Sequence, residues 1–288
     1  MPQKAVSVLR AVLSLTLLTS PGLLTSALAS EVWQGLPEPV AMPTATRSGY
    51  ANVNGVRLYY AVYGHGRPVL LLHGGLASSN YWGAQVRELS KHYAVIVMDS
   101  RGHGRSTRNA QTYTYELMES DVIGLLDQLK VRKVSLIGWS DGGIIGLVMA
   151  MRHPERLTRV FAFGANSDPS GVNPKLGDSV NFNRYIARTE VEYGQLSKTP
   201  RGFASFVDAI GKMWASEPHI TDQLKNIRVP VTIADGQYDE AILRPHTVMM
   251  SKAIPGAKLV ILPNVSHFAM LQNPAEFNAA LSTFMAGR

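Results

Sequence analysis

Short apolar runs alternate with longer amphipathic stretches over most of the chain. The first two β-rich runs, 50–53 and 56–63, flank Asn54-Gly55, a dipeptide that favours a tight hairpin turn. The later runs are short and continuously apolar, as in strands buried on both faces; they span 69–72, 93–99, 133–138, 160–164, 229–234 and 257–262. Helical patterns occupy 81–90, 112–129, 143–151 and 274–285. This alternation predicts an α/β fold with a mainly parallel sheet and helices on both faces.

The alternation stops between residues 165 and 225. At roughly 60 residues this segment is too long for an ordinary connection, since loops rarely exceed about 15 residues. Its large apolar residues follow helical spacing, and most are expected to pack onto the sheet while others line a pocket; they are Phe182, Tyr185, Phe203, Phe206, Met213 and Trp214. The sequence therefore predicts a helical cap at 165–225, inserted into a core made of 50–164 and 226–288.

The beginning of the chain differs from the rest. Basic residues precede an apolar run at 11–18, and a small-x-small site ends at Ala29. This order is typical of a secretory signal peptide, and the apolar run is shorter than the roughly 20 residues that span a bilayer. We therefore expect residues 1–29 to be removed, followed by an extended, poorly ordered leader at 30–49. The mature chain, without a membrane span, would be periplasmic or extracellular, and the absence of cysteine suits either location.

Charge and short motifs exclude several classes of partner. The chain carries 28 Lys and Arg against 21 Asp and Glu, and loss of Lys4 and Arg10 with the signal peptide lowers the net charge from +7 to +5. This excess is small and scattered, so a nucleic-acid partner is not indicated. No spacing of His, Asp or Glu resembles a metal site, and no G-x-G-x-x-G follows a predicted strand, so we expect neither a metal nor a cofactor. The sequence leaves the oligomeric state open.

The run Gly138-Trp139-Ser140-Asp141-Gly142 joins a predicted buried strand to a predicted helix. A serine in this context is forced into a sharp turn that exposes its hydroxyl, and the flanking glycines let the turn close. A serine hydroxyl is a poor nucleophile until a base takes its proton. The motif and its context predict Ser140 as a nucleophile, which requires a histidine and a carboxylate elsewhere in the chain.

His267 and Asp239 are the candidates for these two roles. His267 follows the last predicted strand and precedes the last predicted helix, where the base falls in the chain order nucleophile, acid, base. Asp239 lies just past the 229–234 strand, at a sheet edge where such sites assemble, and would orient the imidazole. Two rival acids are Glu240, expected to point away if Asp239 points inward, and Asp168, which follows the preceding strand.

The loop His73-Gly74-Gly75-Leu76 follows the first parallel strand. Its glycines let backbone amides approach a ligand closely. We expect the amide of Gly75, or that of Leu76 one step behind, to stabilise an oxyanion together with the amide of Asp141 at the start of a helix. His73 is better suited to hold this loop through ring hydrogen bonds than to act as a base.

A second polar turn, 99–106, follows the next predicted strand. It lacks the Lys-Ser or Lys-Thr ending of a phosphate-binding loop, so we expect a packed turn in which Asp99 and Arg101 pair with the backbone and with each other. Several further histidines have no strand before them and are expected in polar loops; these are His65, His92, His219 and His246.

In chain order, these motifs resemble the α/β-hydrolase fold family; they are His73 to Gly75, Asp99 to Gly104, Gly138 to Gly142, Gly236 to Asp239, and Ser266-His267. The region 133–143 and Gly164-Ala-Asn166 are similar to the valacyclovir hydrolase, or biphenyl hydrolase-like, branch of that family. The resemblance implies hydrolysis of a small carboxylic ester through an acyl-enzyme, without a cofactor. Ser140 would attack, His267 would shuttle the proton, and Asp239 would orient His267.

Several alternatives stay open at this point. The same triad would serve hydrolysis of a lactone, an enol-lactone or a carbon–carbon bond next to a ketone, and the fold also serves as a ligand-binding receptor. The Asp141 side chain either binds a substrate ammonium group or favours the start of the following helix. Asp141, Leu76 and Trp139 are the candidate substrate-binding residues. The cap sequence departs from the family's pattern, which leaves the acyl and alcohol groups undetermined.

Overall fold

The computed structural model describes residues 31–287, so the predicted signal peptide lies outside the described residues. These residues form an eight-stranded sheet in the order β1-β2-β4-β3-β5-β6-β7-β8. Within this sheet, β2 is antiparallel to both of its neighbours, β1 and β4, and every other pair of neighbouring strands is parallel. The strands are β1 (Arg47–Val53), β2 (Val56–Tyr63), β3 (Arg67–Leu72), β4 (Tyr93–Met98), β5 (Val134–Trp139), β6 (Leu157–Phe163), β7 (Val231–Gly236) and β8 (Lys258–Leu262).

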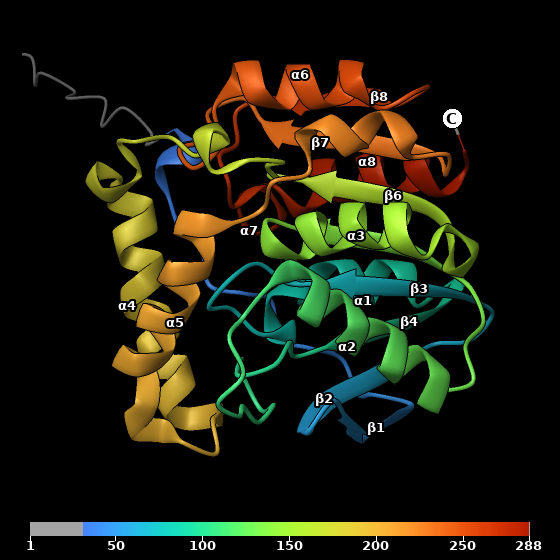
Figure 1. Cartoon of the computed structure of the whole chain (residues 1–288), viewed down its shortest axis with the longest axis vertical. Helices are drawn as coiled ribbons and strands as arrows, with labels where there is room; N and C mark the ends of the chain where they lie inside the picture. Colours follow the sequence, from blue (N-terminus) through green and yellow to red (C-terminus); the bar gives the residue numbers. More distant parts are fainter. Residues whose placement is uncertain (1–30, 288) are drawn as a thin grey trace, which may run out of the picture. The chain divides into compact units, whose positions relative to one another are not determined.

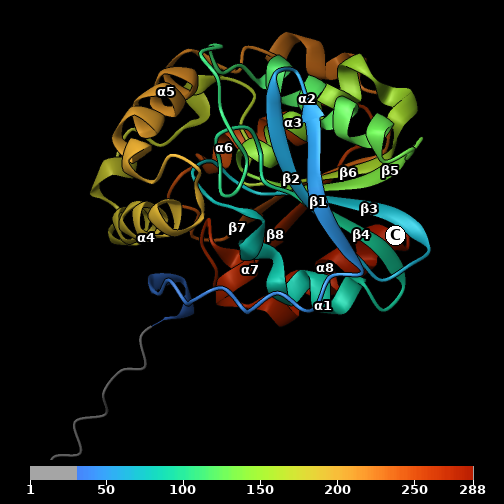
Figure 2. The ribbon, with the colours of Figure 1, turned by 90° about the horizontal axis from the view of Figure 1, so that it is seen from below.

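Helices cover both faces of the sheet, as Figures 1 and 2 show. One face carries α2 (Tyr115–Gln128), α3 (Asp141–Arg152) and α6 (Arg244–Ala253), and the other carries α1 (Gly83–Leu89), α7 (Ala269–Gln272) and α8 (Pro274–Met285). Alternate residues of β3 enter different buried clusters: Leu70 and Leu72 join one, Val69 and Leu71 the other. Because strand side chains alternate between faces, the sheet separates two cores. The predicted α/β architecture is confirmed.

Two helices of the inserted segment stand beyond the carboxyl ends of the central strands (Figure 1). They are α4 (Val180–Leu196), which begins where the Ser179 hydroxyl accepts a hydrogen bond from the Phe182 amide, and α5 (Phe203–Ser216). Phe206 of α5 is fully buried and lies edge-on to the His103 ring at 4.7 Å. This packing fixes the inserted helices over the sheet edge at which parallel strands end.

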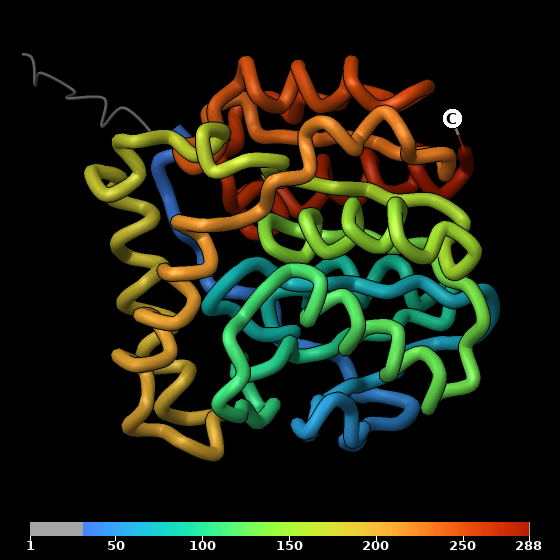
Figure 3. Tube along the Cα trace, viewed as in Figure 1, coloured from blue at the N-terminus to red at the C-terminus, as the bar shows by residue number. Residues whose placement is uncertain are grey.

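The chain before the sheet differs from the expected leader. β1 begins at Arg47, inside the range expected to be extended leader, and we call residues 31–46 the leader from here on. Arg87 of α1 donates to the Ala41 carbonyl at 3.0 and 3.2 Å, and Arg188 of α4 donates to the carbonyls of Leu36 and Pro37. The leader therefore has defined contacts rather than poor order, because side chains remote in sequence satisfy its backbone. Figure 3 follows it in blue past α4.

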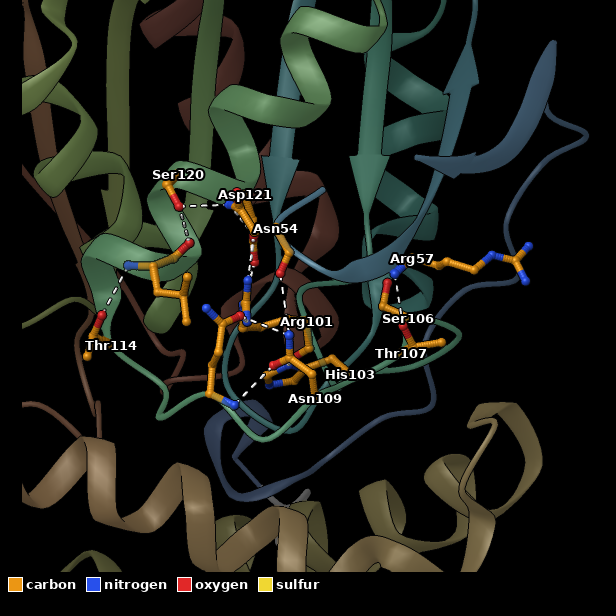
Figure 4. A network of polar contacts seen from close by, with 12 residues as sticks. Asn54, Arg57, Arg101, His103, Ser106, Thr107, Asn109, Thr114, Ser120 and Asp121 are labelled. Carbon is orange, nitrogen blue, oxygen red and sulfur yellow. Dashed lines mark hydrogen bonds and ion pairs between the residues drawn. The ribbon is translucent and has the colours of Figure 1, made fainter. Parts of the chain in front are cut away.

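A polar network fastens the first hairpin to α2 (Figure 4). Arg101 forms a buried bidentate pair with Asp121, at 2.6 and 2.7 Å, and Asn54 of the hairpin turn donates to the same carboxylate at 2.9 Å. Asp99 instead accepts from the Arg105 guanidinium at 3.1 Å. The prediction of an Asp99–Arg101 pair is therefore wrong. The partner of Arg101 lies on α2, and the sequence pattern does not connect that helix to this turn.

Candidate active site

Ser140 occupies a strained turn between β5 and α3. Its φ of 54° and ψ of −119° lie in a region that costs a non-glycine residue about 1–3 kcal/mol. The turn is held by the Ser140 amide, which donates to the Phe163 carbonyl at 2.8 Å. A Cβ at Gly138 would lie 2.1 Å from the Gly142 oxygen, and one at Gly142 would lie 2.2 Å from the Leu72 oxygen. Both flanking positions therefore require glycine.

His267 and Asp239 are brought together from the loops after β8 and β7. His267 Nδ1 lies 2.8 Å from Asp239 Oδ2, and the two side chains are only 4% and 1% exposed. The other Asp239 oxygen accepts from the amides of Ala241 and Ile242 at 2.7 and 2.8 Å. A Cβ at Gly164, at the end of β6, would lie 2.8 Å from the His267 ring. Gly164 thus makes room for the imidazole, a role that the sequence analysis missed.

Burial sets the protonation of this pair. It lowers the pKa of His267, and the carboxylates of Glu240, Asp235 and Asp141 act in the opposite direction. Burial raises the pKa of Asp239 to about 6, while hydrogen bonds that favour its charged form act against this rise. Near neutral pH the imidazole is therefore neutral and able to accept a proton, beside an ionised carboxylate that fixes its Nδ1–H.

The two rival acids have other partners. Glu240 does not point away from His267: its Oε2 accepts from the His267 backbone amide at 3.0 Å. That contact fixes the backbone of His267 rather than its ring. Asp168 accepts from the Ser170 amide at 2.9 Å and from His219 Nδ1 at 2.8 Å. Of the three carboxylates, Asp239 is therefore the one bonded to the His267 ring.

Two other histidines support loops. His73 Nε2 accepts from the Ser100 amide at 3.0 Å, so its Nδ1 carries the proton and donates to the Gly74 carbonyl at 2.7 Å. His73 therefore holds its loop through both ring nitrogens. His246 was expected in a polar loop, but it lies in α6, half-buried, and accepts from the Ser167 amide at 3.0 Å. The sequence analysis had not identified α6.

Gly75 and Asp141 line the same cavity as Ser140. Between residues 31 and 287 neither of their backbone amides has a hydrogen-bond acceptor, so both are available to a ligand. Leu76 is buried and does not line the cavity, which favours Gly75 as the donor. A Cβ at Gly75 would lie 2.3 Å from the Trp214 ring and 2.6 Å from the Asp141 carboxylate, so this position also requires glycine.

The Asp141 carboxylate joins three elements of the fold. It accepts from the Tyr115 hydroxyl of α2 at 2.9 Å and from Trp214 Nε1 of α5 at 2.9 Å. Asp141 is 3% exposed, and burial raises its pKa to about 6 against the effect of these two hydrogen bonds. The side chain therefore does more than favour the start of α3. Its partners were not predicted, since nothing in the sequence pattern links Tyr115 or Trp214 to this turn.

A cavity of about 620 Å³ opens over Ser140 and His267. Among the large apolar residues of the cap, Phe182, Tyr185 and Trp214 line it, together with Trp139 of the core. The others are buried away from it; they are Phe203, Phe206 and Met213. The acidic residues in its wall are Asp141 and Glu217, and none of the described residues that line it is Lys or Arg.

Neither a metal-ion site nor a membrane-spanning helix occurs in the structure over residues 31–287. In the part of the chain that it describes, no group of three or more His, Cys, Asp or Glu residues is arranged to hold a metal ion. Over the same residues, no helix is both long and apolar enough to cross a membrane.

Comparison with known proteins shows the family of this chain. Residues 67–208 match the family described as alpha/beta hydrolase fold. The human protein "Serine hydrolase BPHL" is 30% identical over 280 residues, which cover 90% of this chain and 94% of that protein. The chain belongs to the α/β-hydrolase fold family. The resemblance inferred from the ordered motifs is thereby confirmed, and this member of the family is a hydrolase.

Other relatives of this α/β hydrolase are named for different substrates. The "2-hydroxy-6-oxo-2,4-heptadienoate hydrolase" of Pseudomonas putida is 26% identical, with 77% of this chain and 90% of that protein covered. The solved structure of the enol-lactonase from Burkholderia xenovorans LB400 has a TM-score of 0.68 at 25% identity, and covers 83% of this chain and all of its own. The family is therefore shown, whereas the substrate has to be argued from the site.

Proposed function

We propose that this α/β hydrolase cleaves small carboxylic esters through an acyl-enzyme, with Ser140, His267 and Asp239 as its catalytic triad. The observation that carries the proposal is the strained Ser140 turn, which faces a cavity shared with an imidazole whose Nδ1 is bonded to a buried carboxylate. In a serine hydrolase, an imidazole oriented by a carboxylate in this way takes the proton of the serine hydroxyl and makes it nucleophilic.

In the first half-reaction, Ser140 Oγ attacks the ester carbonyl carbon while His267 Nε2 takes the hydroxyl proton. The carbonyl oxygen becomes an oxyanion, which the amides of Gly75 and Asp141 stabilise at the positive end of α3. The tetrahedral intermediate then collapses, and the alcohol leaves with the proton that His267 returns to it. The acyl group stays bound to Ser140.

In the second half-reaction, His267 takes a proton from water, and the resulting hydroxide attacks the acyl-enzyme. A second tetrahedral intermediate uses the same two amides. Its collapse releases the carboxylic acid, and His267 returns the proton to Ser140 Oγ. Asp239 stays ionised and stabilises the imidazolium that forms in each half-reaction.

The charge of the cavity wall supports a neutral or cationic substrate. Asp141 and Glu217 line the cavity, and none of its described lining residues is Lys or Arg. An anionic substrate would lose hydration without gaining an opposite charge. The Pseudomonas putida relative is named for a dienoate, an acid. The wall of this cavity therefore favours an ester over such an acid.

A specific observation adds a preference for cationic esters, such as amino-acid esters. The Asp141 carboxylate borders the cavity beside the nucleophile, where it is within reach of a substrate ammonium group. Because its pKa is raised to about 6, it is ionised above that pH and becomes neutral below it. We expect the ratio of kcat/KM for cationic over neutral esters to fall as the pH drops through about 6.

An ester panel tests both parts of this proposal. Neutral and amino-acid esters of increasing acyl length, a lactone and a dienoate would be compared by kcat/KM. We expect the esters to be preferred, and Asp141→Asn to reduce kcat/KM more for the cationic esters. Lactone turnover with every ester untouched would overturn the ester assignment. An equal loss on cationic and neutral esters would overturn only the role of Asp141 in ammonium binding.

We also propose export of the chain, with cleavage near Ala29. The support is the order of basic, apolar and small residues in 1–29. The intact mass of protein recovered from the periplasm and the medium checks this. A mass matching a chain that begins near Ser30 is expected, and a full-length mass in the cytoplasm would contradict it.

A further inference from the structure

The beginning of the leader contacts the two loops that carry the acid and the base. The short helical turn η1 (Val32–Gln34) places the Trp33 ring against the ring of Tyr238, with centroids 4.7 Å apart and planes 28° from parallel. Tyr238 immediately precedes Asp239. The leader thus packs on the residue that leads into the catalytic acid.

Gln272 of α7 connects the same part of the leader to the base. Its Nε2 donates to the carbonyls of Gly35 at 2.8 Å and Trp33 at 3.1 Å. Its Oε1 accepts from the Ser266 amide at 2.7 Å, and Ser266 immediately precedes His267. The two ends of one amide side chain, which is only 8% exposed, therefore link the leader to the His267 loop.

The cap shares this contact. Asn181 of α4 donates to the Trp33 carbonyl at 2.8 Å, the same oxygen that Gln272 reaches. Arg188, about two helical turns further along α4, donates to the carbonyls of Leu36 and Pro37. Residues 31–37 consequently lie where the cap, the acid loop and the base loop meet.

The geometry points to a positioning role for Gln272 and the leader residues 31–36, which hold Asp239 and His267 in register with Ser140. This inference rests on the proposed ester hydrolysis. Loops at sheet edges open locally at lower free energy than the strands beneath them. A catalytic group displaced by about 1 Å loses up to roughly 100-fold in rate. Trp33 contacts Tyr238, the residue before Asp239, and Gln272 contacts Ser266, the residue before His267. These two contacts restrain the catalytic carboxylate and the catalytic imidazole.

Gln272→Glu removes the N–H donors that reach the leader carbonyls, together with the one that Nε2 donates to the Ser266 hydroxyl at 3.0 Å. The carboxylate keeps an acceptor for the Ser266 amide but loses the N–H donors and faces the carbonyls of Trp33 and Gly35. We expect kcat on a neutral ester to fall about tenfold with KM within about twofold. Trp33→Ala removes the ring against Tyr238 without adding a charge, so it should lower kcat in the same direction and also move the acidic limb of the pH–rate profile.

Arg87→Ala is the matched control, because it removes a leader contact at Ala41, eight residues beyond Trp33 and away from the Tyr238 and Gln272 contacts, and it should leave kcat unchanged. Melting temperatures and kcat measured well below them separate positioning from stability. Wild-type kcat in both Gln272→Glu and Trp33→Ala would overturn the inference, and so would a lower melting temperature with an unchanged kcat and pH profile. If Gln272→Glu does not fold, Trp33→Ala alone decides. A wild-type enzyme that hydrolyses no ester would instead overturn the proposed function.

Discussion

The sheet edge and the cap both border the cavity, but they depend on different features of the chain. At the sheet edge the backbone itself is specified: Ser140 adopts a strained φ, and Gly138 and Gly142 have no room for a Cβ. In the cap, α5 is a regular helix that turns Phe206 into the core and Trp214 toward the cavity. Side chains on such a helix are exchangeable without altering the backbone.

The two regions should therefore control different properties: the sheet edge the rate of bond cleavage, and the cap the choice of substrate. Substitutions at the sheet edge should change the rate of bond cleavage for every substrate, because they move the reacting groups. Substitutions on the cavity face of the cap should change which substrate is preferred, because they alter only the walls.

The largest effect is expected for Asp239→Asn. An amide at this position cannot stabilise the imidazolium and disfavours the required tautomer, so kcat should fall about 10⁴-fold for all esters, with little change in KM. Asp168→Asn is the control, since Asp168 is bonded to His219 rather than to His267. Steady-state kinetics on two unlike esters check this. A comparable loss in Asp168→Asn would contradict the assignment of the acid.

An intermediate effect is expected for Trp214→Phe. This change keeps an aromatic wall but removes the N–H that donates to Asp141. Losing a hydrogen bond to a charged group costs about 1.5–3 kcal/mol, which destabilises the ionised form of Asp141 and raises its pKa further. The preference for cationic over neutral esters should therefore fall at neutral pH, by up to about tenfold. The ratio of kcat/KM for matched cationic and neutral esters measures this.

Phe206→Leu is the companion variant on the same helix. It alters a buried residue that does not line the cavity, so it should lower the free energy of unfolding by about 1 kcal/mol and leave the ester preference unchanged. A changed preference in Phe206→Leu, with Trp214→Phe unaltered, would break the proposed division between the two faces of α5.

The smallest effect is expected for Glu240→Gln. The amide oxygen still accepts from the His267 backbone amide, while the negative charge that raises the pKa of His267 is lost. The acidic limb of the kcat/KM profile, which requires a neutral imidazole, should therefore move to lower pH. Glu88→Gln, an exposed acid paired with Lys91, is the charge-matched control and should leave the profile in place. A limb that moves to higher pH would contradict the electrostatic role of Glu240.

The sequence was sufficient to predict the parts of the molecule that depend on local patterns. The helix expected at 274–285 is α8 with the same bounds, and the strand before Ser140 is β5 to within one residue at each end. These elements have strong periodicity and clear Gly or Pro boundaries. The glycines around Ser140 were also predictive, because their role follows from the turn that they close.

Contacts between residues that are distant in the sequence could not be predicted from such local patterns. Arg101 pairs with Asp121 rather than Asp99, and Glu240 bonds the His267 amide instead of pointing away. The leader was expected to be poorly ordered because its composition is that of a loop, yet Gln272 fixes it from the other end of the chain. In each case the packing of the elements decides which residue is the partner, and the local periodicity of the sequence gives no information about that packing.

Covalent labelling tests whether Ser140 is the nucleophile. The wild-type protein would be treated with a fluorophosphonate probe and digested, and the modified residue located by mass spectrometry beside a control serine hydrolase. We expect one adduct, on the peptide containing Ser140, and none in a folded Ser140→Ala variant. An unlabelled wild type, or an adduct that persists in Ser140→Ala, would contradict the account.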